Sequence, residues 1–169
     1  LNKAITDALV HMSSLETTEE EAKHTGNLYH VVTDLERIGD HAENMVAYAN
    51  RMIEDSKCFS GIAKEELRYL IDKVYQIYDD ACKHLYEPEQ YTYDKIYHIE
   101  EQIDGIVDAM KENHIERMND LVCNSTQGLI FIETLTDLER VSDHALNIAQ
   151  ASKQRYNHTE DAMKIADIG

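Results

Sequence analysis

The feature that most constrains this chain is a segment of twelve residues that occurs twice. Residues 33–44 read Thr-Asp-Leu-Glu-Arg-Ile-Gly-Asp-His-Ala-Glu-Asn, and residues 136–147, 103 positions later, read Thr-Asp-Leu-Glu-Arg-Val-Ser-Asp-His-Ala-Leu-Asn. Nine of the twelve positions are identical, and most of the shared residues are polar. Because unrelated amphipathic helices share at most their hydrophobic spacing, these polar identities indicate an internal duplication.

Apolar residues around both copies recur at spacings of three and four, which is the period of an amphipathic helix. The first copy has Leu28, Val31, Leu35, Ile38, Ala42, Met45 and Ala49. The second copy has Phe131, Leu135, Leu138, Val141, Ala145 and Ile148. We expect each of these stripes to form a buried seam in a helical bundle.

Each copy also carries two carboxylates one helical turn apart, namely Glu36 with Asp40 and Glu139 with Asp143. A four-residue spacing places both side chains of a pair on one face of the helix, beside the apolar stripe. Hard cations need several oxygen ligands, so such a pair supplies part of a metal site in advance. The alternative is a solvated face, in which Arg37 and Arg140 neutralise aspartates three residues away. The spacing alone leaves both interpretations open.

The motif Asp-Leu-Glu-Arg-Ile-Gly-Asp-His-Ala-x-Asn, which begins at Asp34, resembles the signature of PhoU domains. It is especially similar to the PhoU-like region that follows the membrane part of bacterial sodium/phosphate cotransporter-family proteins. The resemblance implies an all-α fold built from three-helix repeats and a non-enzymatic, regulatory role in phosphate transport. It also implies metal ions bound on Glu/Asp-x-x-x-Asp rows, which map here to Glu36, Asp40, Glu139 and Asp143. The second copy departs from the first at Ser142, which replaces the glycine, and at Leu146, which replaces Glu43. Neither change affects a carboxylate of the pair.

A further acidic row lies in the segment that we expect to form a helix over about 89–121. Glu100 and Asp104 each follow an isoleucine of its apolar stripe by one position. The resemblance implies that this row faces the second copy, so that Glu100, Asp104, Glu139 and Asp143 together bind one or more metal ions. The corresponding row of the first copy would fall before residue 1, and we therefore expect the second site to be the more complete one.

The ions are expected to be divalent or trivalent, and their identity stays open. Mg²⁺, Mn²⁺ or Ca²⁺ suits an all-oxygen site, whereas Fe or Zn suits a site that includes histidine. His41 and His144 directly follow the aspartates of the pairs, and we expect them to be packing or hydrogen-bonding residues.

Two other functions are weighed against a metal-binding regulatory domain. A structural helical module that binds a partner protein without metal fits the same periodicity. A di-iron carboxylate enzyme is the less favoured alternative, since it needs two Glu-x-x-His motifs and only Glu21-Ala22-Lys23-His24 has that spacing.

The composition excludes several classes of partner. Asp and Glu number 33 against 16 for Lys and Arg, giving a formal net charge of −17, which repels nucleic acid and anionic membranes. No run of about 18 apolar residues occurs, so we expect no direct membrane insertion. The resemblance implies a cytoplasmic domain at the inner face of the cell membrane, whose partner is a membrane transporter portion of the same or another protein. A homodimer is also left open.

Breaks in the apolar pattern give the expected organisation. Ser13 and Ser14 interrupt a short first helix, and the acidic run after Thr18 is typical of the start of a second helix that ends near Asp55. Further helices are expected over about 62–86, 89–121 and 126–156, with Pro88 at a helix start. We therefore predict an elongated antiparallel bundle. Residues 1–57 would be the end of a truncated first repeat and residues 58–169 the second repeat, packed as one helical domain.

Overall fold

The computed structural model describes residues 2–15, 18–119 and 125–166, with side chains described within 3–15, 18–119 and 126–153. This part of the chain contains five α-helices and no strand: α1 (Asn2–Ser13), α2 (Glu19–Glu54), α3 (Gly61–His84), α4 (Tyr93–Asn119) and α5 (Ser125–Ala166). The predicted all-α class is confirmed. None of the described helices combines the length and the apolar character needed to cross a membrane.

Helix α2 begins where the acidic run predicted a cap. The Thr18 hydroxyl accepts a hydrogen bond from the Glu21 backbone N–H, and the Glu21 carboxylate accepts one from the Thr18 backbone N–H at 2.8 Å. This reciprocal arrangement pairs donors that the first turn of a helix otherwise leaves free, and it lowers the pKa of Glu21. The glutamate of the one Glu-x-x-His spacing is therefore an exposed capping residue, which argues against the di-iron arrangement.

The connection from α2 to α3 confirms the predicted break. Ser56 adopts a left-handed backbone conformation with φ of 50°. Its N–H donates to the Ile53 carbonyl, and the Lys57 N–H donates to the Met52 carbonyl at 2.9 Å, which together satisfy the last turn of α2. Ser60 then caps α3 through its side chain.

Two predicted helix boundaries are wrong. Pro88 lies in the turn between α3 and α4, and α4 begins only at Tyr93, because the N–H groups of Gln90 and Tyr91 bond back to the Glu87 carbonyl and extend the turn. Helix α5 continues past the predicted end near residue 156 to Ala166. No glycine or proline lies in residues 157–166 to stop it.

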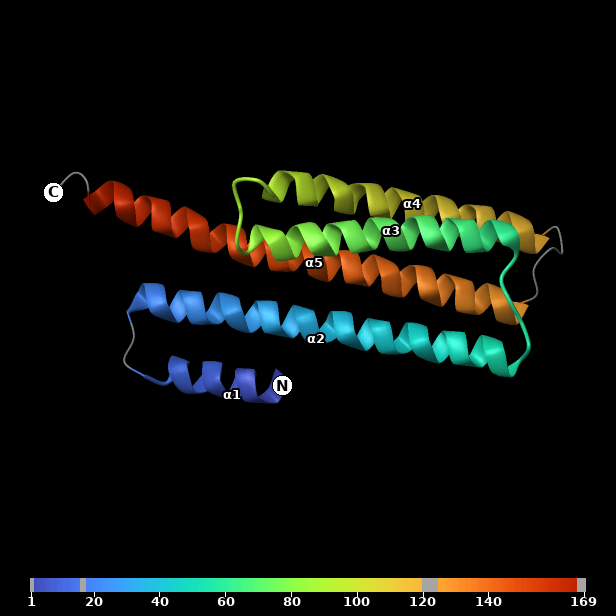
Figure 1. Cartoon of the computed structure of the whole chain (residues 1–169), viewed down its shortest axis with the longest axis horizontal. Helices are drawn as coiled ribbons and strands as arrows, with labels where there is room; N and C mark the ends of the chain where they lie inside the picture. Colours follow the sequence, from blue (N-terminus) through green and yellow to red (C-terminus); the bar gives the residue numbers. More distant parts are fainter. Residues whose placement is uncertain (1, 16–17, 120–124, 167–169) are drawn as a thin grey trace.

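Helices α3, α4 and α5 form a three-helix bundle, and α2 packs along another side of α5 (Figure 1). Helix α1 folds back along α2, and its described interhelical contacts are all with α2. Helices that follow one another in the chain run antiparallel, as predicted, and the molecule is elongated (Figure 1). The fully buried side chains at the centre of the bundle come from α3, α4 and α5 and include Leu70, Ile77, Ile96, Ile103, Val107, Phe131 and Leu135.

The predicted seam is confirmed in the second copy and only partly in the first, where Ile38 and Met45 are half-buried against the core. In α5 every residue of the predicted stripe is buried, namely Phe131, Leu135, Leu138, Val141, Ala145 and Ile148. In α2 only Val31 of the stripe is buried, whereas Leu35 is 40% exposed and Ala42 and Ala49 are also exposed. The reason is the number of neighbours. Helix α5 is enclosed by α2, α3 and α4, but the described contacts of α2 are only with α1 and α5.

Candidate metal centre

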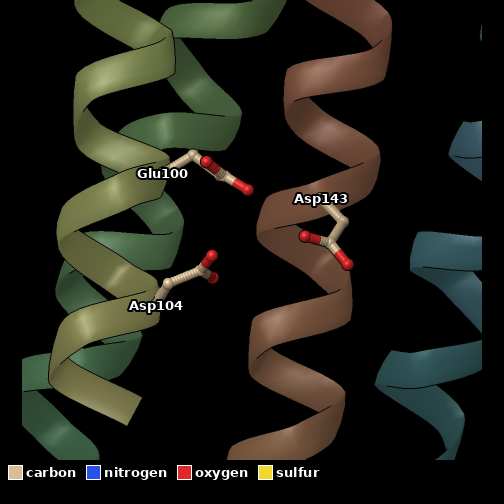
Figure 2. A group of neighbouring side chains, drawn as sticks. All are labelled: Glu100, Asp104 and Asp143. Carbon is tan, nitrogen blue, oxygen red and sulfur yellow. The ribbon is translucent and has the colours of Figure 1, made fainter. Parts of the chain in front are cut away.

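Three carboxylates meet between α4 and α5. Glu100 and Asp104 project from successive turns of α4 towards Asp143 on α5 (Figure 2). One carboxylate oxygen from each residue lies within 4.8 Å of the other two. Within the described residues, no other set of three or more histidine, cysteine or acidic side chains has this geometry. The structure thus brings together three of the six predicted ligands.

Packing of apolar neighbours holds the three carboxylates at the edge of the bundle. Ile103 directly precedes Asp104 and is fully buried, and Ala145, two residues after Asp143, is fully buried against the same core. Glu100 follows the half-buried Ile99, and Asp104 and Asp143 lie one or two positions from a buried residue, so all three side chains emerge at the margin of the α4–α5 contact. Glu100 and Asp143 are half-buried and Asp104 is exposed, so the group is open to solvent on one side.

Partial burial and the proximity of other acids disfavour the charged forms of Glu100 and Asp104. Partial burial, together with the charges of Asp104 and Asp143, raises the pKa of Glu100 to about 7. Burial, followed by the charges of Asp143 and Glu139, also raises the pKa of Asp104. Like charges that are partly desolvated repel strongly, and a protonated carboxyl relieves the repulsion. A bound cation would relieve it in the same way.

Glu139 does not join these three carboxylates. Lys111 of α4 donates a hydrogen bond from Nζ to Oε2 of Glu139 at 2.9 Å. Arg140 pairs with Asp143 at 3.1 Å, as its three-residue spacing predicted. The predicted group of four carboxylates is therefore three carboxylates followed by a lysine–glutamate ion pair.

Glu36 and Asp40 lie apart from this group. Both are exposed on α2, and no acidic row faces them within the described residues. In the described part of the chain only the second copy has a facing acidic row, and that it carries the more complete metal site stays a prediction. The repeated motif supplies two carboxylates in each copy. The two copies differ because α4 adds further carboxylates beside the second copy.

Comparison with protein-family models matches the PhoU domain over residues 1–49 and 67–152. Both copies of the repeated motif, and all three clustered carboxylates, lie within the matched segments. The chain belongs to the PhoU domain family.

A curated PhoU relative supports this membership at a distance. The phosphate-specific transport system accessory protein PhoU homolog 1 of Thermotoga maritima is 26% identical to this chain over 117 residues. The alignment covers 69% of this chain and 50% of the relative, so the chain spans about half the length of the curated relative that it matches. No solved structure matches the chain.

The PhoU motif also supplies a contact between its two copies. Nδ1 of His41 in α2 lies 2.7 Å from an Asp137 carboxylate oxygen in α5, and Nδ1 of His144 in α5 lies 2.8 Å from an Asp34 carboxylate oxygen in α2. Since a carboxylate can only accept, each Nδ1 carries the hydrogen. The two imidazole rings stack with centroids 5.6 Å apart. The predicted hydrogen-bonding role of the histidines is confirmed, but their partners were not identified from the sequence.

A signal for these partners was present in the PhoU motif. In each copy the aspartate precedes the histidine by seven residues, which is two helical turns and one helix face. Asp137 makes more polar contacts than Asp34. It also accepts a hydrogen bond from Asn44 Nδ2 at 3.4 Å, and partial burial together with Asp137 raises the pKa of Tyr48 to about 12.

Proposed function

We propose that this chain is a metal-binding regulatory domain that acts with a phosphate transport system and is not an enzyme. The observation that carries the proposal is the convergence of Glu100, Asp104 and Asp143 from two packed helices, with oxygens within 4.8 Å of one another. The PhoU family model supports the regulatory role, and the name of the Thermotoga maritima relative supports the connection with phosphate transport.

The electrostatics of the three carboxylates favour a cation. The pKa of Glu100 is raised to about 7, which means that the metal-free site does not readily hold all three negative charges. A divalent ion bound there would compensate these charges and bind only the folded chain. It would therefore stabilise the fold by mass action.

The ligand set favours hard metal ions. All three candidate ligands offer carboxylate oxygens, and Nδ1 of the nearest histidine in sequence, His144, is bonded to Asp34. Oxygen-only sites suit Mg²⁺ and Mn²⁺, whereas iron and zinc sites usually include nitrogen or sulfur ligands. We propose Mg²⁺ or Mn²⁺ as the occupant and place iron and Zn²⁺ behind them.

The proposed setting is the cytoplasmic face of a membrane, next to a transporter. The repeated motif is especially similar to the PhoU-like region of sodium/phosphate cotransporter-family proteins, which supports a transporter portion of the same or a partner protein as the contact. With a net charge of −17 the chain repels free phosphate, so any direct response to phosphate would need a bridging metal ion. Occupancy of the metal site would then be the regulated quantity.

Thermal unfolding with and without metal tests the proposal. The melting temperature of the wild type should rise with Mn²⁺ and fall with a chelator, since a ligand at a hundred times its Kd adds about 2.7 kcal/mol of stability. The variant Glu100→Gln/Asp143→Asn should lose this dependence and be more stable than the wild type without metal. The variant Glu36→Gln/Asp40→Asn is the control and should keep most of it. A wild-type melting temperature indifferent to Mg²⁺, Mn²⁺ and Fe²⁺ would refute a metal site.

The second candidate function is a protein-interaction module, and one observation favours it. Helix α2 exposes large apolar residues that include Leu35 at 40%, Val46 at 61% and Ile53 at 73%. Such a surface is typical of a helix that packs against another segment. The metal experiment separates the two candidates, because an interaction module without metal would show no metal-dependent stability.

A further inference from the structure

We infer that Lys111 is a built-in counter-ion that competes with the bound metal for Glu139. The inference rests on the metal-binding function proposed above and concerns how that site is controlled. Lys111 and Glu139 form an ion pair at 2.9 Å at the end of the acidic row, where the family resemblance implied a fourth carboxylate ligand.

The geometry makes the ion pair an extension of the carboxylate group. On α4 the residues Glu100, Asp104 and Lys111 are spaced by four and seven positions, so all three point to the same helix face. On α5, Glu139 lies one turn from Asp143. Between α4 and α5, the carboxylates of Glu100 and Asp104 therefore face Asp143. One turn away along α5, the ammonium group of Lys111 faces the carboxylate of Glu139.

Lys111 also lies close to the carboxylate group. It shares a face of α4 with Asp104, and its ammonium group lies 2.9 Å from Glu139. An ammonium group this close reduces the negative potential that attracts a metal ion. Lys111 thus weakens metal binding in two ways, through its charge and through its hold on the fourth carboxylate.

The ion pair is weak enough to be exchanged for a metal ligand. The side chains of Lys111 and Glu139 are 30% and 29% exposed, so water screens their attraction. Hard divalent ions take six or more oxygen ligands, and the three converging carboxylates leave positions to fill. Glu139 is one turn from Asp143 and has a longer side chain than aspartate. Its carboxylate is therefore placed to occupy one of the remaining coordination positions of the metal ion. Metal entry then releases Lys111 to solvent.

Calorimetric titration with Mn²⁺ tests this competition on four chains: wild type, Lys111→Met, Glu139→Gln and the double variant. Lys111→Met should bind Mn²⁺ about three- to tenfold more tightly than the wild type, as expected for loss of a nearby like charge and of a competitor. In the Glu139→Gln background the same substitution should tighten binding by less than about twofold, since the competition is already gone and only the charge of Lys111 is removed. Lys83→Met is the matched control, because Lys83 pairs with Asp79 on α3, and it should leave Mn²⁺ affinity unchanged.

Each outcome decides the inference separately from the proposed function. If the wild type binds Mn²⁺ and Lys111→Met binds no more tightly, the competition is refuted and the metal site stands. Equal tightening with and without Glu139 also refutes it, because Lys111 would then act only through its charge. If Lys111→Met binds Mn²⁺ and the wild type does not, Lys111 blocks the site and the proposed metal function of the wild type fails. If neither chain binds, both ideas fail.

Discussion

Helices α2 and α5 carry the same motif in two different surroundings. Leu138 of α5 is 3% exposed, whereas Leu35, at the same position of the first copy, is 40% exposed. Asp143 of α5 meets two carboxylates from α4, whereas Asp40 of α2 meets no such group in the described part of the chain. The contrast shows that the motif provides a helix with a core side and an acidic flank. What each side does depends on the helices packed beside it.

Truncation of the equivalent leucines should give the largest difference in stability between the two copies. Leu138→Ala should lower the free energy of unfolding by about 2–5 kcal/mol, because it leaves a cavity in an enclosed core. Leu35→Ala should cost less than about 1 kcal/mol, since solvent already reaches that side chain. Urea denaturation of both variants measures the difference. Equal losses would mean that the first-copy stripe is buried as fully as the second.

The two Asp–His pairs should give the next largest effect, and they should be unequal. Both aspartates are buried, so removing one leaves a histidine without its partner and should cost about 1–3 kcal/mol. Asp137→Ala should cost more than Asp34→Ala, because Asp137 also accepts from Asn44. Urea midpoints for the two variants give the order, with Asp137→Ala/His41→Ala as the check on pairwise coupling. The reverse order would show that the extra partner of Asp137 adds nothing.

The smallest expected effect is a pH dependence confined to the second copy. The pKa of Glu100 is about 7 in the folded chain against an ordinary 4.5, so the folded state holds a proton that the unfolded state has lost. The stability from this proton is fully present below about pH 4.5 and is lost as the pH rises through about 7. In chelator, Glu100→Gln should flatten the fall in urea midpoint between pH 5 and pH 8, while Glu36→Gln should not. An unchanged slope in Glu100→Gln would assign the dependence to other groups.

Much of the fold was readable from local pattern. The three-and-four spacing predicted the helices, and Thr18 with Glu21 marked the start of α2, because caps and periodicity act over one or two turns. Boundaries that depend on less local features were misjudged. Pro88 suits a helix start in isolation, yet the backbone bonds to the Glu87 carbonyl keep it in a turn.

The three clustered carboxylates were all among the predicted ligands, but which of the predicted ligands cluster was not predicted correctly. The duplicated motif pointed to Asp143, and the PhoU resemblance to the row of Glu100 and Asp104, which does face it. Glu139 was grouped with them because the PhoU resemblance implied a ligand row made of Glu139 and Asp143, which lie one turn apart on α5. Spacing along one helix carries no information about Lys111, which lies on another helix and pairs with Glu139.

The sequence by itself determined that this is a helical protein with a duplicated acidic motif, since periodicity and repetition are properties of the chain. Only the tertiary structure decided which copy is enclosed and which carboxylates converge. It also decided that His41 and His144 each bond to the aspartate of the other copy. The physical reason is that burial, repulsion and ion pairing depend on distances between helices. Those distances are set by packing around α5 and not by residue spacing within either repeat.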